Sequence, residues 1–190
     1  MALLRSSVAG MESQLASGSV VEQLMSRLLA TTGRHPGEGE VRSWKASLPI
    51  LVNDLMSAGL SNVEVLVEYQ LPLTSKRVDA VIAGTDPKTG GDSYVLVELK
   101  QWHAADSYED SPSLVHIDAY GNRPVLHPLE QVAGYAEYLM DYLPGLSTGE
   151  ATITSCAYLH NATRMTVAAL FDYREHPDSV LFTGDAKSDF

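Results

Sequence analysis

Three apolar segments with strand-like composition lie in the middle of the chain, and they constrain its fold more than any other feature. Residues 63–71, 77–83 and 94–102 are rich in β-branched and aromatic side chains, which is typical of strands. Between the second and third segments lies 84–93, which is dense in glycine and other turn-forming residues. We therefore expect a hairpin here, and a core built around a sheet.

Helical patterns flank these segments. Apolar residues recur at helical spacing in 20–30, 41–60 and 128–143, and 151–159 has the composition of a fourth strand. This order predicts an α/β fold, with a mixed central β-sheet flanked by helices. The Ser-, Ala- and Gly-rich residues 1–19 are expected to be loosely ordered. The polar stretch 101–123 is expected to be irregular, and the tail after 159 is expected to be helical or irregular.

The length and the composition limit the class of protein further. A chain of 190 residues can form one compact domain with a core. We predict a partly flexible, helical N-terminal extension over 1–39 and a single α/β domain over 40–190. With Cys156 as the only cysteine, no internal disulfide can form. No apolar run approaches the length that spans a bilayer, so we expect a cytoplasmic protein with no membrane partner.

Charge is distributed unevenly along the chain. The formal net charge is −11, which argues against a simple basic clamp for nucleic acid. Residues 41–101, however, hold six basic and seven acidic residues, whereas 102–190 hold four basic and thirteen acidic residues. Any nucleic acid is therefore expected to bind at a local site in the first of these regions, weakly, and with help from a partner.

Charged side chains interrupt two of the apolar strands. Because side chains alternate along a strand, Glu98 and Lys100 project to one face, and the hairpin would bring Asp79 beside them. Two carboxylates and the carbonyl of Leu99 offer hard oxygen ligands for Mg²⁺ or Mn²⁺. A lysine next to such a metal suits in-line attack on a phosphodiester. The alternative is an ordinary surface ion pair between Glu98 and Lys100 on an edge strand.

These residues resemble the motifs of a known family. Asp79 followed by Glu98-Leu99-Lys100 resembles the PD-(D/E)XK nuclease pattern, and Gln131-Val-Ala-Gly-Tyr135 resembles the Gln-x-x-x-Tyr motif of its RecB-like branch. The resemblance extends over about 40–161. It implies a restriction-endonuclease-like core.

A narrower resemblance concerns the residues around these motifs. The chain is similar to nuclease-like domains at the N-terminus of Schlafen-like helicase or ATPase proteins in four segments: Glu68-Tyr-Gln-Leu-Pro, Lys76-Arg-Val-Asp79, Glu98-Leu-Lys100 and His127-Pro-Leu-Glu-Gln131. The chain itself contains no Walker-type phosphate-binding loop. The similarity therefore implies that a helicase or ATPase domain or subunit is the partner of this chain.

The family resemblance also implies roles for single residues. Asp79 and Glu98 would hold the metal, and Lys100 would position the attacking water. Gln131 and Tyr135 would support the site and the DNA backbone, and their i, i+4 spacing on a helix is consistent with that role. The alternative for these two residues is ordinary helix amphipathicity.

Four further residues are less firmly placed. The family carries an acidic residue on its first helix, for which Glu40 is the candidate and Glu22 its rival. Lys76 and Arg77 precede the aspartate and could hold a phosphate, or could simply be solvated at the start of a strand.

Together these observations predict a Mg²⁺- or Mn²⁺-dependent nuclease acting on DNA, with RNA as an alternative substrate. It would serve as the nuclease domain or subunit of a larger defence or repair system linked to a helicase or ATPase. A homo-oligomer is compatible with the sequence. The alternative function is a catalytically silent module of the same fold, used for nucleic-acid binding or protein docking.

Overall fold

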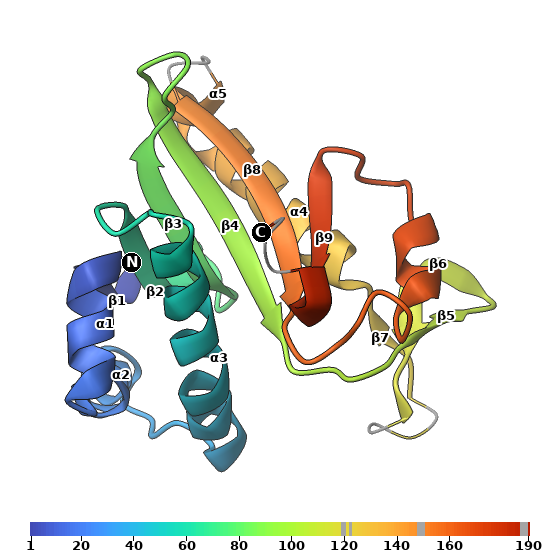
Figure 1. Ribbon diagram of the computed structural model, residues 1–190, viewed down its shortest axis with the longest axis horizontal. Coiled ribbons are helices and arrows are strands. Elements are labelled where there is room, and N and C mark those ends of the chain that lie inside the picture. The colour runs from blue at the N-terminus through green and yellow to red at the C-terminus, as the bar shows by residue number, and fades with distance from the viewer. Residues whose placement is uncertain (119–120, 122, 148–150, 187–189) are drawn as a thin grey trace.

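A six-stranded mixed sheet forms the centre of the molecule (Figure 1). The computed structural model describes residues 1–118, 121, 123–147, 151–186 and 190. The strands lie in the order β1 (Ala2–Ser7), β2 (Glu64–Gln70), β3 (Arg77–Thr85), β4 (Asp92–Lys100), β8 (Ala151–Leu159) and β9 (Ser179–Thr183). The first four are antiparallel neighbours, whereas β8 and β9 are added in parallel. The predicted α/β class with a mixed central sheet is confirmed.

The predicted hairpin joins β3 to β4. Its ladder runs from the pair Thr85 and Asp92 near the turn to the pair Ala80 and Val97 at the far end. In the turn, the side chain of Asp86 accepts a hydrogen bond of 2.7 Å from the backbone N–H of Lys88, as turn aspartates commonly do. Beyond Ala80 and Val97 no further residues of the two strands are paired.

Helices cover both faces of the sheet. On one face lie α1 (Val8–Ala16), α2 (Ser19–Thr32) and α3 (Glu38–Ser57), and Leu51 of α3 packs in one cluster with Val65 and Val97. On the other face α4 (Pro128–Tyr142), which runs behind β8 in Figure 1, packs Val132 against Leu96. A short helix, α5 (Pro144–Ser147), follows it. In the described part of the chain no helix is long and apolar enough to cross a membrane.

The expectation for residues 1–19 is wrong. Residues 2–7 form β1, which pairs with β2, and Leu4, Val8 and Met11 are buried in the same core as the central strands. Ser7 caps α1 by accepting a hydrogen bond from the backbone N–H of Gly10. Ser7 therefore caps a helix in an ordered segment, and residues from both 1–39 and 40–190 pack in this one core.

Two other segments are more regular than expected. Within 101–123, β5 (Asp106–Tyr108) and β6 (Ser111–His116) form a second sheet with β7 (Val125–Leu126). The tail contains β9 and two 3-10 helices, at Ala168–Asp172 and Gly184–Ala186. The irregular reading of 101–123 is wrong, whereas the 3-10 helices of the described tail agree with the expected helical character and only β9 was missed. The missed strands are short and depend on pairing with other strands.

Candidate active site

The candidate site lies where β3 and β4 part. One residue beyond the last pair of the ladder, Asp79 Oδ2 accepts a hydrogen bond of 2.8 Å from the backbone N–H of Leu99. The N–H and C=O groups of a strand residue point to the same side, so the carbonyl of Leu99 also faces β3. The opening between the strands therefore presents a carboxyl group and a backbone carbonyl together.

Glu98, Lys100 and two residues of α4 form one hydrogen-bonded cluster. Lys100 Nζ donates to Glu98 Oε1 at 2.7 Å and to Gln131 Oε1 at 3.1 Å. Gln131 Nε2 donates to Glu98 Oε1 at 2.8 Å and to the hydroxyl of Tyr135 at 3.2 Å. The structure thus brings together the residues predicted from β4 and from α4. Burial raises the pKa of Tyr135, so its hydroxyl stays protonated at neutral pH.

The carboxyl groups of Glu98 and Asp79 interact directly. Glu98 is only 3% exposed, and burial together with the charge of Asp79 raises its pKa to about 8. Burial also raises the pKa of Asp79. Within the described residues Glu98 Oε2 is buried with no hydrogen-bond partner. A bound cation would offset the charge repulsion that raises the pKa of Glu98 and would give its Oε2 a partner.

The donor set favours one class of cation. The part of the chain that the structure describes contains no group of three or more His, Cys, Asp or Glu that could hold a metal. A zinc site of side-chain ligands is therefore not formed by these residues. Asp79, Glu98 and the Leu99 carbonyl fit Mg²⁺ or Mn²⁺, because such ions are bound through one or two carboxylates and retain several waters.

Lys100 is held as a charged donor. Burial lowers its pKa, but the charges of Glu98 and Asp79 outweigh burial, and the pKa is raised overall. Its ammonium group lies 5.4 Å from the centroid of the Trp102 ring. Two of its three N–H groups are used by Glu98 and Gln131, so within the described residues a third remains for a water or a phosphate oxygen.

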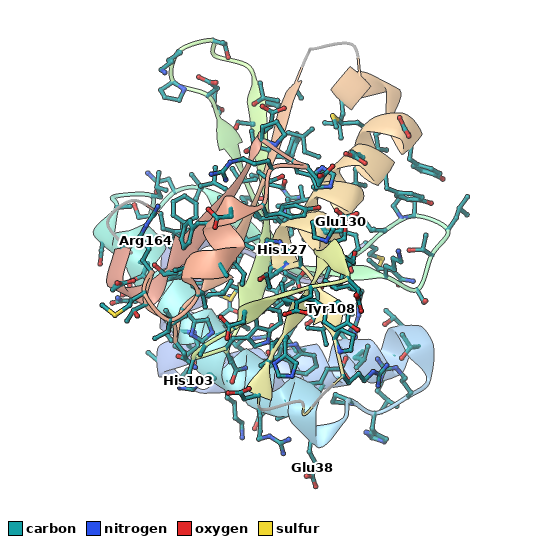
Figure 2. The ribbon with its side chains drawn as sticks, turned by 90° about the vertical axis from the view of Figure 1, so that its right-hand side faces the viewer. Glu38, His103, Tyr108, His127, Glu130 and Arg164 are labelled. Atoms are coloured by element: carbon teal, nitrogen blue, oxygen red, sulfur yellow. The ribbon has the colours of Figure 1, made fainter. Side chains whose placement is uncertain are left out.

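A cleft of about 450 Å³ opens over the cluster. Its walls come from α3, β3, β4, β7, α4 and the segment after β4. Its lining residues are Gly39, Ser43, Asp79, Glu98, Leu99, Lys100, Gln101, Trp102, Val125, Leu126 and Gln131. Figure 2 shows the second sheet, which carries Tyr108, beside the start of α4 at His127. This small sheet therefore supplies one wall of the cleft.

Glu68 of β2 is a site residue for which the sequence analysis proposed no role. It lines a small void together with Asp79, and its Oε1 accepts a hydrogen bond of 2.6 Å from Trp44 Nε1. Burial raises its pKa to about 7. Its backbone φ of 53° is rare for a residue with a side chain. The sequence did hold a signal for Glu68, and it is the one that identified Asp79: an acidic residue lies inside an apolar strand.

Glu40 lies beside the cleft rather than in it. One oxygen accepts a hydrogen bond of 3.1 Å from the backbone N–H of Gly37 at the start of α3, and the carboxylate pairs with Arg34 and Arg77. Burial raises its pKa, but the two arginines outweigh burial, and the pKa is lowered. Among the described residues Glu40 makes no hydrogen bond or ion pair with either Asp79 or Glu98.

The other predicted residues are also placed. Arg77 pairs with Glu40 and lies 3.1 Å from Glu68 Oε2, so its guanidinium group is engaged by carboxylates. Lys76 is exposed, and its Nζ lies 6.0 Å from the centroid of the Tyr135 ring. Glu22, the rival of Glu40, is exposed in the first turn of α2. Of the residues predicted to contact phosphate, Lys76 is therefore the cation exposed beside the cluster.

Comparison with known proteins adds no relative. No protein-family model, no curated protein and no solved structure matches this chain. The chemistry of the cleft is therefore inferred from its own residues.

Proposed function

We propose that this chain is a metal-dependent nuclease that hydrolyses DNA phosphodiester bonds. The observation that carries the proposal is the buried Oε2 of Glu98, which has no hydrogen-bond partner among the described residues and lies beside a second carboxyl group and a charged lysine. A purely structural ion pair between Glu98 and Lys100 would have no need of Asp79. The carboxyl pair instead supports a site that binds a divalent cation.

Asp79, Glu98 and the Leu99 carbonyl would hold Mg²⁺ or Mn²⁺. A bound ion of this kind supplies positive charge to stabilise the negative charge that develops on a phosphodiester during hydrolysis. Lys100 would orient the attacking water by donating a hydrogen bond from Nζ, which stays protonated at neutral pH. Gln131 is a positioning residue, because it holds both Lys100 and Glu98 by hydrogen bonds from α4.

The distribution of charge along the chain supports a partner protein that helps it to bind DNA. The second half of the chain is strongly acidic, and Lys76 is one of few cations near the cleft. Binding to DNA depends largely on contacts between cations and phosphates. We therefore propose that the chain is a cytoplasmic domain or subunit of a defence or repair system. A helicase or ATPase partner would contribute part of its affinity for DNA.

The test combines metal binding with cleavage. The full chain, freed of metal, is titrated with Mn²⁺ by calorimetry and then incubated with labelled single-stranded DNA, duplex DNA and RNA. We expect saturable Mn²⁺ binding and DNA cleavage, both lost in Asp79→Asn. The matched control is Asp141→Asn, the same change at an exposed position of α4. Saturable binding without cleavage of any substrate would contradict the nuclease and favour the silent module.

A further inference from the structure

The turn between β2 and β3 carries an apolar side chain in an unfavourable place. The backbone N–H of Thr74 lies 3.4 Å from the carbonyl of Leu71, which closes a four-residue turn with Pro72 and Leu73 at its centre. Leu73 has a φ of 55° and is 89% exposed. The third position of such a turn favours glycine or asparagine, because a branched side chain is strained at positive φ. Neither the turn nor the core therefore accounts for a leucine here.

The turn is held in one conformation by its neighbours. Gln70 Nε2 donates to the carbonyl of Thr74 at 2.8 Å, and the backbone N–H of Lys76 donates to Thr74 Oγ1 at 3.1 Å. Leu71, which precedes the turn, is buried in the core. Leu73 is therefore presented outward on a rigid base, which reduces the entropic cost of using it in a contact.

Helix α4 connects this turn to the candidate active site. The hydroxyl of Tyr138 donates to the carbonyl of Pro72 at 2.6 Å. Gln131, Tyr135 and Tyr138 follow one another at i, i+4 and i+7, and so share one face of α4. Seven residues of helix span about 10 Å, which corresponds to about three nucleotides at 3.4 Å each.

We infer that Leu73 is a wedge that inserts between stacked base pairs of duplex DNA bound in the cleft. Branched apolar side chains are used in this way by proteins that unstack or kink a duplex. Lys76, exposed on the same loop, is placed to hold the neighbouring phosphate. This inference rests on the proposed nuclease function and adds to it the substrate form, a duplex that is opened about three nucleotides from the cleaved bond.

The experiment uses 2-aminopurine, whose fluorescence rises when it is unstacked. The native chain first maps the cleaved bond in a duplex. The Lys100→Ala chain, which should bind without cutting, is then mixed with duplexes carrying the probe at successive positions. We expect a fluorescence rise centred about three nucleotides from the mapped bond.

Variants of Leu73 distinguish an effect on DNA unstacking from an effect on the stability of the fold. Leu73→Gly relieves the positive φ, so its unfolding temperature should equal or exceed that of the native chain. It should nevertheless lose the fluorescence rise and bind duplex about tenfold more weakly. Leu73→Met keeps an apolar side chain and should retain both. Met165→Gly is the matched control, because Met165 is 86% exposed and lies in a different loop.

The outcomes distinguish the inference from the proposed function. If the native chain cuts DNA and Leu73→Gly still unstacks the probe, the wedge is overturned and the nuclease stands. If Leu73→Gly alters binding but no duplex shows unstacking, Leu73 contacts something other than the base stack and the wedge is again overturned. If the native chain neither binds nor cuts any duplex while Mn²⁺ binding is intact, the wedge is overturned, and the nuclease is overturned as well only if single-stranded DNA and RNA also stay uncut.

Discussion

Two neighbouring residues of α4 belong to clusters of opposite character. Gln131 joins Glu98 and Lys100, where the pKa of the buried carboxyl is raised. Glu130 accepts hydrogen bonds from the hydroxyl of Tyr173 and from His176 Nε2, and these bonds, the first above all, lower its pKa despite partial burial. Within the described residues, one helix therefore separates a buried carboxyl group with one unpartnered oxygen from a carboxylate whose hydrogen bonds lower its pKa.

The second cluster, around Glu130, is held together by ring stacking, hydrogen bonds and ion pairs. His127, close to Glu130 in Figure 2, stacks on Tyr173 with ring centroids 4.2 Å apart, and its Nδ1 accepts a hydrogen bond from the backbone N–H of Leu129. His176 lies between Glu130 and Glu137, one at each ring nitrogen. These contacts hold the segment after β8, which carries Tyr173 and His176, against α4. The two clusters therefore differ in the unpartnered oxygen of Glu98 among the described residues, and on this oxygen the proposed metal site rests.

The largest expected difference between the clusters is in cleavage. Glu98→Gln removes a proposed metal ligand and should reduce the rate of DNA cleavage about a thousandfold, since charge stabilisation of the reacting phosphate would be lost. Glu130→Gln makes the same chemical change one residue from Gln131 and should leave the rate within about twofold. Initial rates with Mg²⁺ measure both. Equal losses would show that the clusters act as one unit.

The next largest effect is on stability in acid. Burial lowers the pKa of His127 to about 4, below the usual value of 6.5, so the unfolded chain binds the proton more tightly. The stability from this residue is complete above about pH 6.5 and should fall by up to about 3 kcal/mol as the pH drops to 4. His127→Asn keeps the helix-capping acceptor and should flatten this dependence. Urea unfolding between pH 4 and 7 measures the slope, and an unchanged slope would contradict the assignment to His127.

The third largest effect is the stabilisation of the folded chain by a bound metal ion. An ion that binds only the folded chain stabilises it by about 2.7 kcal/mol at one hundred times its Kd. We expect Mn²⁺ to raise the unfolding temperature of the native chain and of Glu130→Gln, but not of Glu98→Gln. Scanning fluorimetry with and without Mn²⁺ measures this. A shift retained in Glu98→Gln would place the ion elsewhere.

The smallest effect concerns one hydroxyl. Tyr173→Phe removes the hydrogen bond to Glu130 and should cost about 1 kcal/mol of stability, because His176 still pairs with that carboxylate. Mn²⁺ affinity should not change. Urea unfolding and calorimetry report the two quantities separately, and a weaker Mn²⁺ affinity would link the clusters through α4.

Much of the site could be predicted because it depends on local periodicity. Alternation along β4 places Glu98 and Lys100 on one face, and helical spacing does the same for Gln131 and Tyr135. Turn composition identified the hairpin that brings in Asp79. Glu68 had no predicted role although it carries the same signal as Asp79, an acidic residue in an apolar strand; its positive φ and its hydrogen bond from Trp44 are visible only in the structure.

The missed strands have a different cause. β1 has only six residues and β9 has five, so neither offers a long alternating pattern. Each exists because a neighbouring strand supplies its hydrogen bonds, β2 for β1 and β8 for β9. The acidic residue assigned to the first helix shows the same limit, since the composition of α3 could not reveal that Arg34 and Arg77 engage Glu40.

By itself, the sequence determined the α/β class, the hairpin and the residues that share a face, because these follow from periodicity and turn chemistry within short segments. Only the tertiary structure decided that β3 and β4 part at Ala80 and Val97, that one oxygen of Glu98 lacks a partner within the described residues, and that Leu73 points into solvent from a strained turn. These features depend on burial, on register and on contacts between residues distant in the chain, and no local pattern encodes them.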